Sequence, residues 1–288
     1  MPLFAENTAD LFLVNGRHGA FLVNRHDCYV GVSLIVYGEY SEAEWRMIDR
    51  FLEPGNVAMD VGANIGAFTV PMARKVGPAG RVLCFEPQPY AAELLNLNLS
   101  ANGLANVALH NFGLSSCQEQ REAELPVYTK EGNFGGVCFI NAGKGLAAEF
   151  KRLDDVFTLP RLDFIKLDIE GMENDMLMGA FSTLKRTKPV MYVENHPGPH
   201  SPLLIKTLFD LGYRLWWHTP YYFNPQNYLG QKENLYGGQL SVNMLCLPAE
   251  RLELNARVPE GLIPIEKPED SLRAADGSLR TSLPHGAI

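Results

Sequence analysis

The chain has 288 residues, of which 46% are hydrophobic and 20% are charged, as in ordinary globular proteins with one large α/β domain or two small ones. A formal net charge of −8 argues against nonspecific binding to nucleic acid or an anionic membrane, although it does not exclude a specific nucleic-acid substrate. No apolar run suits a membrane span, the first residues lack a signal-peptide pattern, and the scattered cysteines indicate neither disulfides nor zinc, so we expect a reduced, cytoplasmic protein.

Residues 1–40 are predicted to form a β flap on the main domain. Two apolar runs, 11–14 and 20–23, flank the turn pair Asn15-Gly16, as in a β-hairpin. The apolar run 29–36 would add a third strand to this flap.

The run 57–61 predicts a buried parallel strand, and Gly62 and Gly66 follow it in a turn that leads into a helix. Such a turn aims backbone N–H groups at a ligand, either a dinucleotide or S-adenosylmethionine. The turn lacks the G-x-G-x-x-G spacing of dinucleotide sites, and Asp60 would repel a pyrophosphate but suit an ammonium or a sulfonium. The turn, with Asn64 at its centre, therefore favours S-adenosylmethionine, although similar turns also occur without a ligand.

The next elements continue a doubly wound pattern. The run 81–85 predicts a second strand that ends in Glu86, at the distance from the turn where an acid binds ribose hydroxyls. A lone strand-end glutamate would be expected to have no role, but beside Asp60 and the glycines the binding role is favoured. A helix and a third strand over 107–113 follow, and Gly113 is expected beside an adenine ring.

Residues 116–150 interrupt this alternation and are predicted to form a β-hairpin insertion. Four further segments are predicted as strands of the main sheet: 162–171, 188–195, 213–218 and, antiparallel at its end, 242–247. The main domain would then span 41–249, and 250–288 would be a tail that wraps the surface or is partly disordered.

Aromatic residues crowd between the last two strands, from Trp216 to Tyr236. Rings in a loop at a sheet edge can stack on an acceptor, but they can equally pack on each other or form a homodimer contact. The acceptor-binding residues expected here are Trp217, His218 and Tyr222.

Several motifs together resemble the FkbM family of S-adenosylmethionine-dependent methyltransferases. They are D-V-G-A-N-I-G at 60–66, F-E-P-Q-P at 85–89, F-I-K-L-D-I-E-G at 164–171, Y-V-E-N at 192–195, F-N-P-Q-N-Y-L-G-Q-K-E-N-L-Y-G at 223–237 and S-V-N-M-L-C-L-P at 241–248. Each motif alone is only moderately specific, whereas their order along residues 36–249 is a strong signal. Residues 37–40 also resemble a family segment near the cofactor, although a solvated acidic start to the helix that Ser41 caps explains them equally.

The resemblance implies an α/β, Rossmann-like class I methyltransferase fold, with a seven-stranded, mostly parallel sheet whose last strand is antiparallel. The residues expected to bind S-adenosylmethionine are Asp60, Gly62, Asn64, Gly66, Glu86, Gly113 and Asp168. Family members usually methylate a hydroxyl, and we expect a sugar or a small biosynthetic metabolite as the acceptor. The alternatives are an NAD-dependent oxidoreductase and a catalytically silent binding module of the same fold.

A hydroxyl is a poor nucleophile at neutral pH, so a base must accept its proton or a metal must lower its pKa. The candidate catalytic residues end the fourth and fifth strands: Asp168, Glu170, Glu194 and His196, with Asn195 as a substrate contact. In one route Asp168, Glu194 and Asn195 bind Mg²⁺ or Ca²⁺. In the other, which we favour because the resemblance does not itself imply a metal, Glu194 or His196 is a metal-free base. A third interpretation is that Lys166 and these acids only pair with each other.

Overall fold

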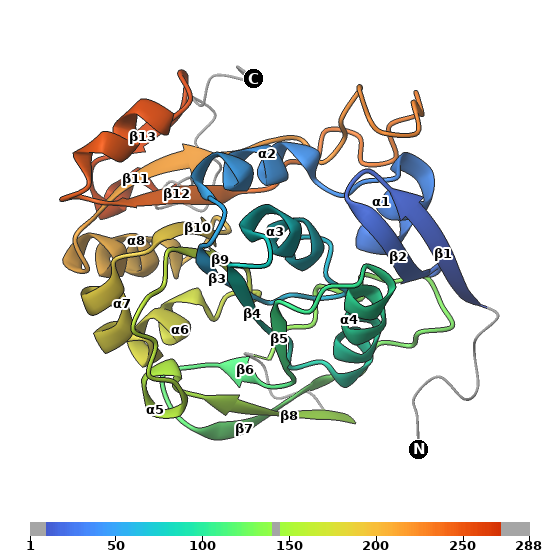
Figure 1. Ribbon diagram of the computed structural model, residues 1–288, viewed down its shortest axis with the longest axis horizontal. Coiled ribbons are helices and arrows are strands. Elements are labelled where there is room, and N and C mark those ends of the chain that lie inside the picture. The colour runs from blue at the N-terminus through green and yellow to red at the C-terminus, as the bar shows by residue number, and fades with distance from the viewer. Residues whose placement is uncertain (1–9, 140–144, 272–288) are drawn as a thin grey trace.

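A computed structural model describes residues 10–139 and 145–271 of the protein. Its centre is an eight-stranded sheet (Figure 1). In spatial order its strands are β13 (Ile263–Ile265), β11 (Tyr213–His218), β12 (Asn243–Pro248), β10 (Val190–Glu194), β9 (Phe164–Leu167), β3 (Val57–Val61), β4 (Arg81–Phe85) and β5 (Val107–His110). From β10 to β5 all neighbours are parallel, whereas β12 is antiparallel to β10 and β11. This is the predicted class I methyltransferase, Rossmann-like arrangement with an antiparallel end.

The sheet has one strand more than predicted, because part of the C-terminal segment joins it. β13 pairs antiparallel with β11, so that Leu215 lies opposite Ile265. Two short 3₁₀ helices, η2 (Leu252–Arg257) and η3 (Pro268–Asp270), flank that strand. The C-terminal extension thus contributes an edge strand that the sequence did not predict, while residues 272–288 lie outside the described chain.

Helices cover both faces of the sheet (Figure 1). One face carries α2 (Glu42–Phe51), α3 (Thr69–Val76) and α4 (Pro89–Ala101), and the other carries α5 (Leu153–Val156), α6 (Glu173–Gly179), α7 (Phe181–Thr187) and α8 (Ser201–Asp210). Because strand side chains alternate, Ala58 packs with the first set and Met59 with the second. All the parallel strands therefore end at one edge of a sheet that is buried on both faces.

The predicted N-terminal hairpin is present as β1 (Leu11–Gly16) and β2 (Gly19–Asn24), but its turn is two residues later than expected, since Gly16 pairs with Gly19. The predicted third strand is wrong, because those residues form the helix α1 (Val30–Tyr37). The carboxylate of Asp27 accepts hydrogen bonds from the backbone N–H groups of Tyr29 and Gly31 and so caps the start of this helix.

The insertion predicted at 116–150 contains two of the strands of a separate three-stranded sheet, ordered β6-β8-β7. Its strands are β6 (Gly113–Leu114), β7 (Glu119–Glu124) and β8 (Gly145–Lys151), of which β7 and β8 are antiparallel. Phe139 and Phe150 of this region pack with Met172 against the main domain.

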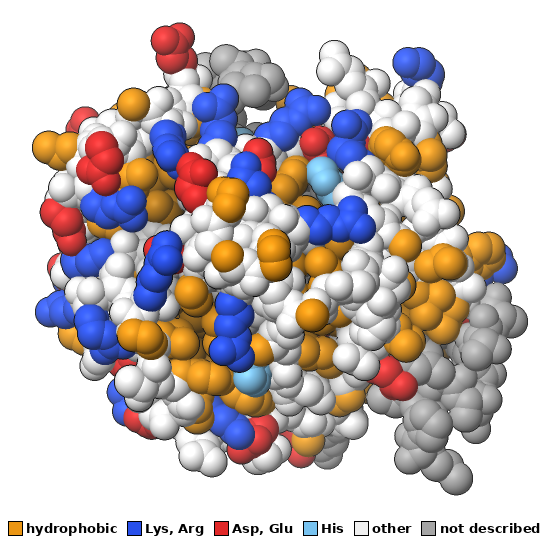
Figure 2. All heavy atoms as spheres, in the orientation of Figure 1, with side chains coloured by type: hydrophobic (Ala, Val, Ile, Leu, Met, Phe, Trp, Pro, Cys, Tyr) orange, Lys and Arg blue, Asp and Glu red, His pale blue; other side chains and the backbone are white. Residues whose placement is uncertain are grey.

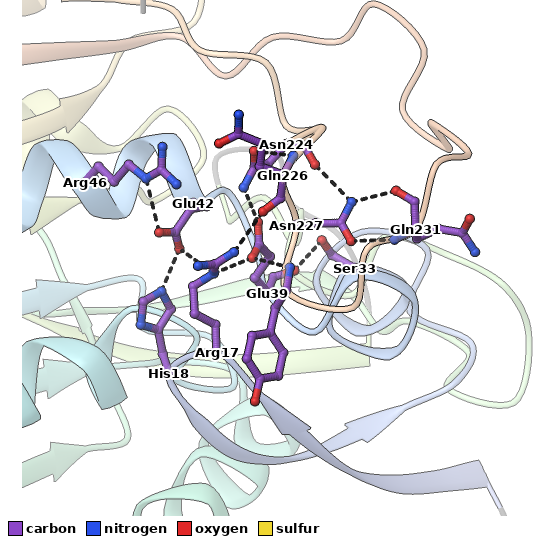
Figure 3. A network of polar contacts seen from close by, with 11 residues as sticks. Arg17, His18, Ser33, Glu39, Glu42, Arg46, Asn224, Gln226, Asn227 and Gln231 are labelled. Atoms are coloured by element: carbon purple, nitrogen blue, oxygen red, sulfur yellow. Dashed lines mark hydrogen bonds and ion pairs between the residues drawn. The ribbon is translucent and has the colours of Figure 1, made fainter.

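The loop between β11 and β12 packs on the N-terminal hairpin and α1 (Figure 3). The buried carboxylate of Glu39 accepts hydrogen bonds from Arg17 Nε at 2.6 Å, Asn224 Nδ2 at 2.7 Å and the backbone N–H of Tyr228 at 2.9 Å. These bonds, together with Leu229 N–H to the Tyr37 carbonyl, fix a long loop that contains no regular strand of its own.

Charged side chains are distributed without a dominant patch on the face shown in Figure 2, where lysines and arginines alternate with acidic and apolar groups. Within the described ranges, none of the helices is long and apolar enough to cross a bilayer.

Candidate active site

A cavity of about 350 Å³ lies at the carboxyl ends of β3, β4, β9 and β10. This volume is within the range of small-molecule sites. Its lining comes from the strand ends, from the β insertion, and from a wall built by residues 29–44 and 222–241. Nine of the predicted site residues line it: Gly62, Asn64, Glu86, Gly113, Asp168, Glu170, Glu194, His196 and Tyr222.

The glycine turn after β3 supplies shape to this cavity. Gly62 has φ +83°, and a Cβ atom there would lie 1.8 Å from the carbonyl oxygen of Asp168, so only glycine fits between the ends of β3 and β9. The N–H of Gly62 donates to the Phe85 carbonyl, and the N–H of Asn64 donates to Glu86 Oε2. Contrary to expectation, these N–H groups thus stabilise the turn itself instead of facing a ligand.

Glu86 lies after β4, as predicted, and is only 7% exposed. Its two oxygens accept hydrogen bonds from the backbone N–H groups of Asn64, at 2.8 Å, and Gln88, at 2.9 Å. Burial raises its pKa to about 7, although both hydrogen bonds oppose the shift. The carboxylate is thereby fixed at the mouth of the glycine turn, with remaining acceptor capacity toward the cavity.

Two predicted cofactor residues do not line the cavity. The carboxylate of Asp60 accepts a hydrogen bond from the Thr69 hydroxyl at 2.6 Å, and its other oxygen lies 3.9 Å from Lys166 Nζ. A Cβ atom at Gly66 would lie 2.6 Å from Leu95 Cδ1, so this glycine serves the packing of α4. Both residues therefore support the elements around the cavity without lining it.

The ends of β9 and β10 bring four predicted catalytic side chains into the cavity. Lys166, 3% exposed, places Nζ 3.0 Å from Asp168 Oδ2. His196 Nε2 lies 2.9 Å from Glu194 Oε1, and the imidazole is about half exposed. Glu170, with φ +54°, completes the group.

These acids titrate differently. Burial raises the pKa of Glu194 well above its usual range, and the negative charges of Asp168 and Glu170 raise it further. Burial and Asp168 raise the pKa of Glu170 to about 7. Burial also opposes ionisation of Asp168, but Lys166 above all holds the pKa of Asp168 below its usual range. Asp168 is therefore the permanent anion of the group.

A family model described as a methyltransferase FkbM domain matches residues 60–215 of this chain. The chain belongs to the FkbM methyltransferase family. Methyltransferase sdnD of Sordaria araneosa is 30% identical over 160 residues, which cover 42% of this chain and 59% of the relative. The 2-O-methyltransferase NoeI of Sinorhizobium fredii is 25% identical over 161 residues, 50% of this chain and 65% of the relative. This FkbM chain thus spans less than two thirds of either relative.

A solved methyltransferase FkbM from Methylobacillus flagellatus shares 17% sequence identity with this chain, with a TM-score of 0.45. The match covers 66% of this chain and 43% of that one.

Membership of the FkbM family implies S-adenosylmethionine as cofactor, in place of the NAD alternative. The residues present fit it. The glycine turn and Glu86 form a cradle suited to a nucleoside, and the acids at the ends of β9 and β10 complement a sulfonium and an ammonium. Glu194 Oε2 is buried and has no hydrogen-bond partner among the described residues, so it is available to a cationic or donor group.

Of the expected acceptor residues only Tyr222 lines the cavity of this FkbM protein. Trp217 points into the core from β11, and its Nε1 donates to the carbonyl of Asp270. His218 Nδ1 is bonded to the Tyr192 hydroxyl at 2.7 Å, and burial lowers the pKa of His218 to about 4. Trp217 and His218 lie in β11, as predicted for 213–218, but placing them at the acceptor site was wrong, because their buried side chains do not line the cavity.

The metal set proposed from the sequence is not assembled either. Asn195 Nδ2 donates to Met244 Sδ inside the sheet, and Asn195 does not line the cavity. The group that could hold an ion consists instead of Glu170, Glu194 and His196, whose ligand atoms lie within 4.8 Å of one another.

Sequence reasoning missed the role of Glu44, which lines the cavity from α2 and is only 4% exposed. Its carboxylate accepts hydrogen bonds from the Ser41 hydroxyl and from Asn243 Nδ2. In the sequence, a glutamate three residues after a serine is typical of a capping box, so the pattern assigns Glu44 to the helix start and gives no sign that it lines a cavity. Tyr40 also lines the cavity, as one of the two interpretations of residues 37–40 required.

Replacing Glu86 with Gln should weaken binding of S-adenosylhomocysteine roughly 10- to 150-fold, since a charge-assisted hydrogen bond contributes about 1.5–3 kcal/mol. Because the pKa of Glu86 is about 7 and ligand hydroxyls bond best to the carboxylate, wild-type affinity should rise with pH through that value. Calorimetry from pH 6 to 8 checks both points, with exposed Glu122→Gln as the control. An affinity unchanged in Glu86→Gln would remove Glu86 from the cofactor site.

Proposed function

We propose that this protein transfers the methyl group of S-adenosylmethionine to a hydroxyl of a sugar or a small biosynthetic metabolite. The observation that carries this proposal is the His196–Glu194 pair, 2.9 Å apart and beside the permanent anion Asp168. A base held by a second polar group is what a weakly acidic hydroxyl requires. The name of the relative NoeI, a 2-O-methyltransferase, supports the same chemistry.

The roles follow from the geometry of the cavity. The bound cofactor supplies a methyl group made electrophilic by the sulfonium. His196 accepts the proton of the acceptor hydroxyl at Nε2 or, if Nε2 keeps its bond to Glu194, at Nδ1, and Glu194 holds the ring. Asp168 stabilises positive charge near the ends of β9 and β10, while Lys166 behind it keeps Asp168 ionised.

The test is transfer of an isotopically labelled methyl group by the full chain to a panel of glycosides and hydroxylated metabolites, read by mass spectrometry. We expect S-adenosylhomocysteine to form together with a methyl ether. Label found only on nitrogen, in protein or in nucleic acid, would contradict the hydroxyl as acceptor. Tight binding of S-adenosylhomocysteine with no transfer to any panel member would instead favour the silent binding module.

We further expect turnover to survive chelation, since the proposal uses a metal-free base. A divalent ion, if the reaction used one, would bind the group of Glu170, Glu194 and His196, and a chelator would remove it. Activity is compared before and after exhaustive EDTA dialysis. Complete loss that Mg²⁺ or Mn²⁺ restores would establish the metal route.

A further inference from the structure

The charge balance of the cavity restricts which acceptor can enter. Among the described lining residues, five are acidic: Glu44, Glu86, Asp168, Glu170 and Glu194. The only lysine or arginine among them is Lys166, whose Nζ is already held by Asp168 and lies near Asp60. His196 is likewise paired with Glu194. A carboxylate or phosphate on the acceptor would therefore enter an acidic lining in which the pKa values of Glu86, Glu170 and Glu194 are already raised, and it would meet no available cation.

One wall of the cavity is aromatic. The rings of Tyr29, Tyr40 and Tyr222 line the cavity there. Tyr222 is stacked on Tyr40 with centroids 6.0 Å apart, and Tyr29 meets Tyr222 edge to face at 6.1 Å. Buried Tyr236 supports the group from behind, 5.4 Å from Tyr222, and donates its hydroxyl to the Tyr29 carbonyl. Aromatic faces of this kind bind apolar ring surfaces.

The same wall carries neutral polar groups. The Tyr29 hydroxyl donates to Gln239 Oε1 at 3.2 Å, and both side chains are accessible. Tyr222 lines the same cavity as Glu44, Asp168 and Glu194. Burial raises the pKa of Tyr222 above its usual range, and these acids raise it further. Ser241 lines the cavity beside them. Hydroxyl and amide groups beside aromatic faces match a ring that bears several hydroxyls.

The wall is also held in place before any ligand arrives. Glu39 fixes the loop that carries Tyr222 through Arg17, Asn224 and Tyr228 (Figure 3). Backbone bonds between residues 220–222 and 239–241 close the base of the same loop. A preformed wall reduces the entropic cost of binding and makes recognition selective.

We propose that the tyrosine wall, made of Tyr29, Tyr40 and Tyr222 together with Gln239, selects an uncharged, polyhydroxylated ring as the acceptor. This inference rests on the proposed function. It narrows the acceptor class to neutral saccharide-like molecules and excludes acceptors that carry a phosphate or carboxylate near the reacting hydroxyl.

The first arm of the test measures binding without turnover. Saturation-transfer NMR on the full chain with S-adenosylhomocysteine should detect neutral methyl glycosides. Matched uronic acids and sugar phosphates should bind about tenfold more weakly or worse, as a cost of about 1.4 kcal/mol implies. Equal or tighter binding of the anionic partners, or no binding of any neutral glycoside, would overturn the inference. Neutral glycosides that bind but are never methylated would instead contradict the proposed function.

The second arm uses variants in the wall. Tyr222→Leu and the exposed Gln239→Ala should each raise the KM or Kd for the neutral glycoside about tenfold, while the affinity for S-adenosylhomocysteine changes less than about twofold. Tyr221→Leu is the matched control, because Tyr221 is the exposed neighbour that does not line the cavity. Glycoside affinity that is unchanged in both wall variants, or that falls equally in Tyr221→Leu, would refute the assignment.

Discussion

Replacing Lys166 with Met should lower the free energy of unfolding by about 3–5 kcal/mol, the cost expected when one member of a buried ion group is removed. Lys166 Nζ lies 3.0 Å from Asp168 and 3.9 Å from Asp60, and both carboxylates would lose their cation. One oxygen of Asp60 already lacks a hydrogen-bond partner among the described residues. The variant would thus contain buried charge that nothing compensates.

The loss of unfolding free energy in Lys166→Met should depend on pH. Without Lys166, the folded-state pKa of Asp60 should rise further above its unfolded value, and that of Asp168 should rise from below its unfolded value toward it. Protonation of the two carboxylates then removes the uncompensated buried charge. The difference from wild type should therefore be largest near pH 7–8 and shrink as the pH approaches 4. Urea unfolding at both pH values measures it. Lys206→Met is the control, because Lys206 forms an exposed pair with Asp210 that contributes about 0.3–0.5 kcal/mol. A loss as small as in the control would show that the buried group is not a coupled unit.

The part of the site that follows local rules could be predicted from the sequence. The turn at Gly62 and the acid at Glu86 depend on a strand, a tight turn and a second parallel strand, each visible in consecutive residues. The predicted fourth strand likewise placed Asp168 near its end, at the sheet edge where parallel strands end. The sequence could not predict which acceptors the N–H groups of the turn bind, because these acceptors, Phe85 and Glu86, lie at the end of the neighbouring strand.

The errors have a common cause in contacts between distant segments. The run 30–37 is as apolar as a strand, yet Asp27 caps it as a helix that supports the loop after β11. Trp217 lies in the predicted strand 213–218, but it was expected to contact the acceptor, whereas pairing of that strand with β12 and β13 leaves its ring in the core. Glu44 lines the cavity, and its carboxylate accepts a hydrogen bond from Asn243, far along the chain. No periodicity within one segment reports such contacts.

Replacing His196 with Asn, or Glu194 with Gln, should lower kcat roughly 10²- to 10⁴-fold, the usual contribution of a positioned base. Both side chains line the cavity, and they lie 2.9 Å apart. Since the base and the group that orients it act as a unit, the double variant should be little slower than the worse single variant.

Single-turnover kinetics with labelled cofactor and the best acceptor of the panel separate this effect from binding. The affinity of His196→Asn for S-adenosylhomocysteine should stay close to wild type, because the loss concerns proton acceptance and the exposed imidazole supports little packing. His200→Asn is the matched control, an exposed histidine four residues further along that does not line the cavity. Losses that simply add in the double variant would mean that Glu194 acts independently, as the deeply buried acid of the group. Wild-type kcat in both single variants would leave Asp168 and Glu170 as the remaining acids near the reacting hydroxyl, and would move the base from β10 to the end of β9.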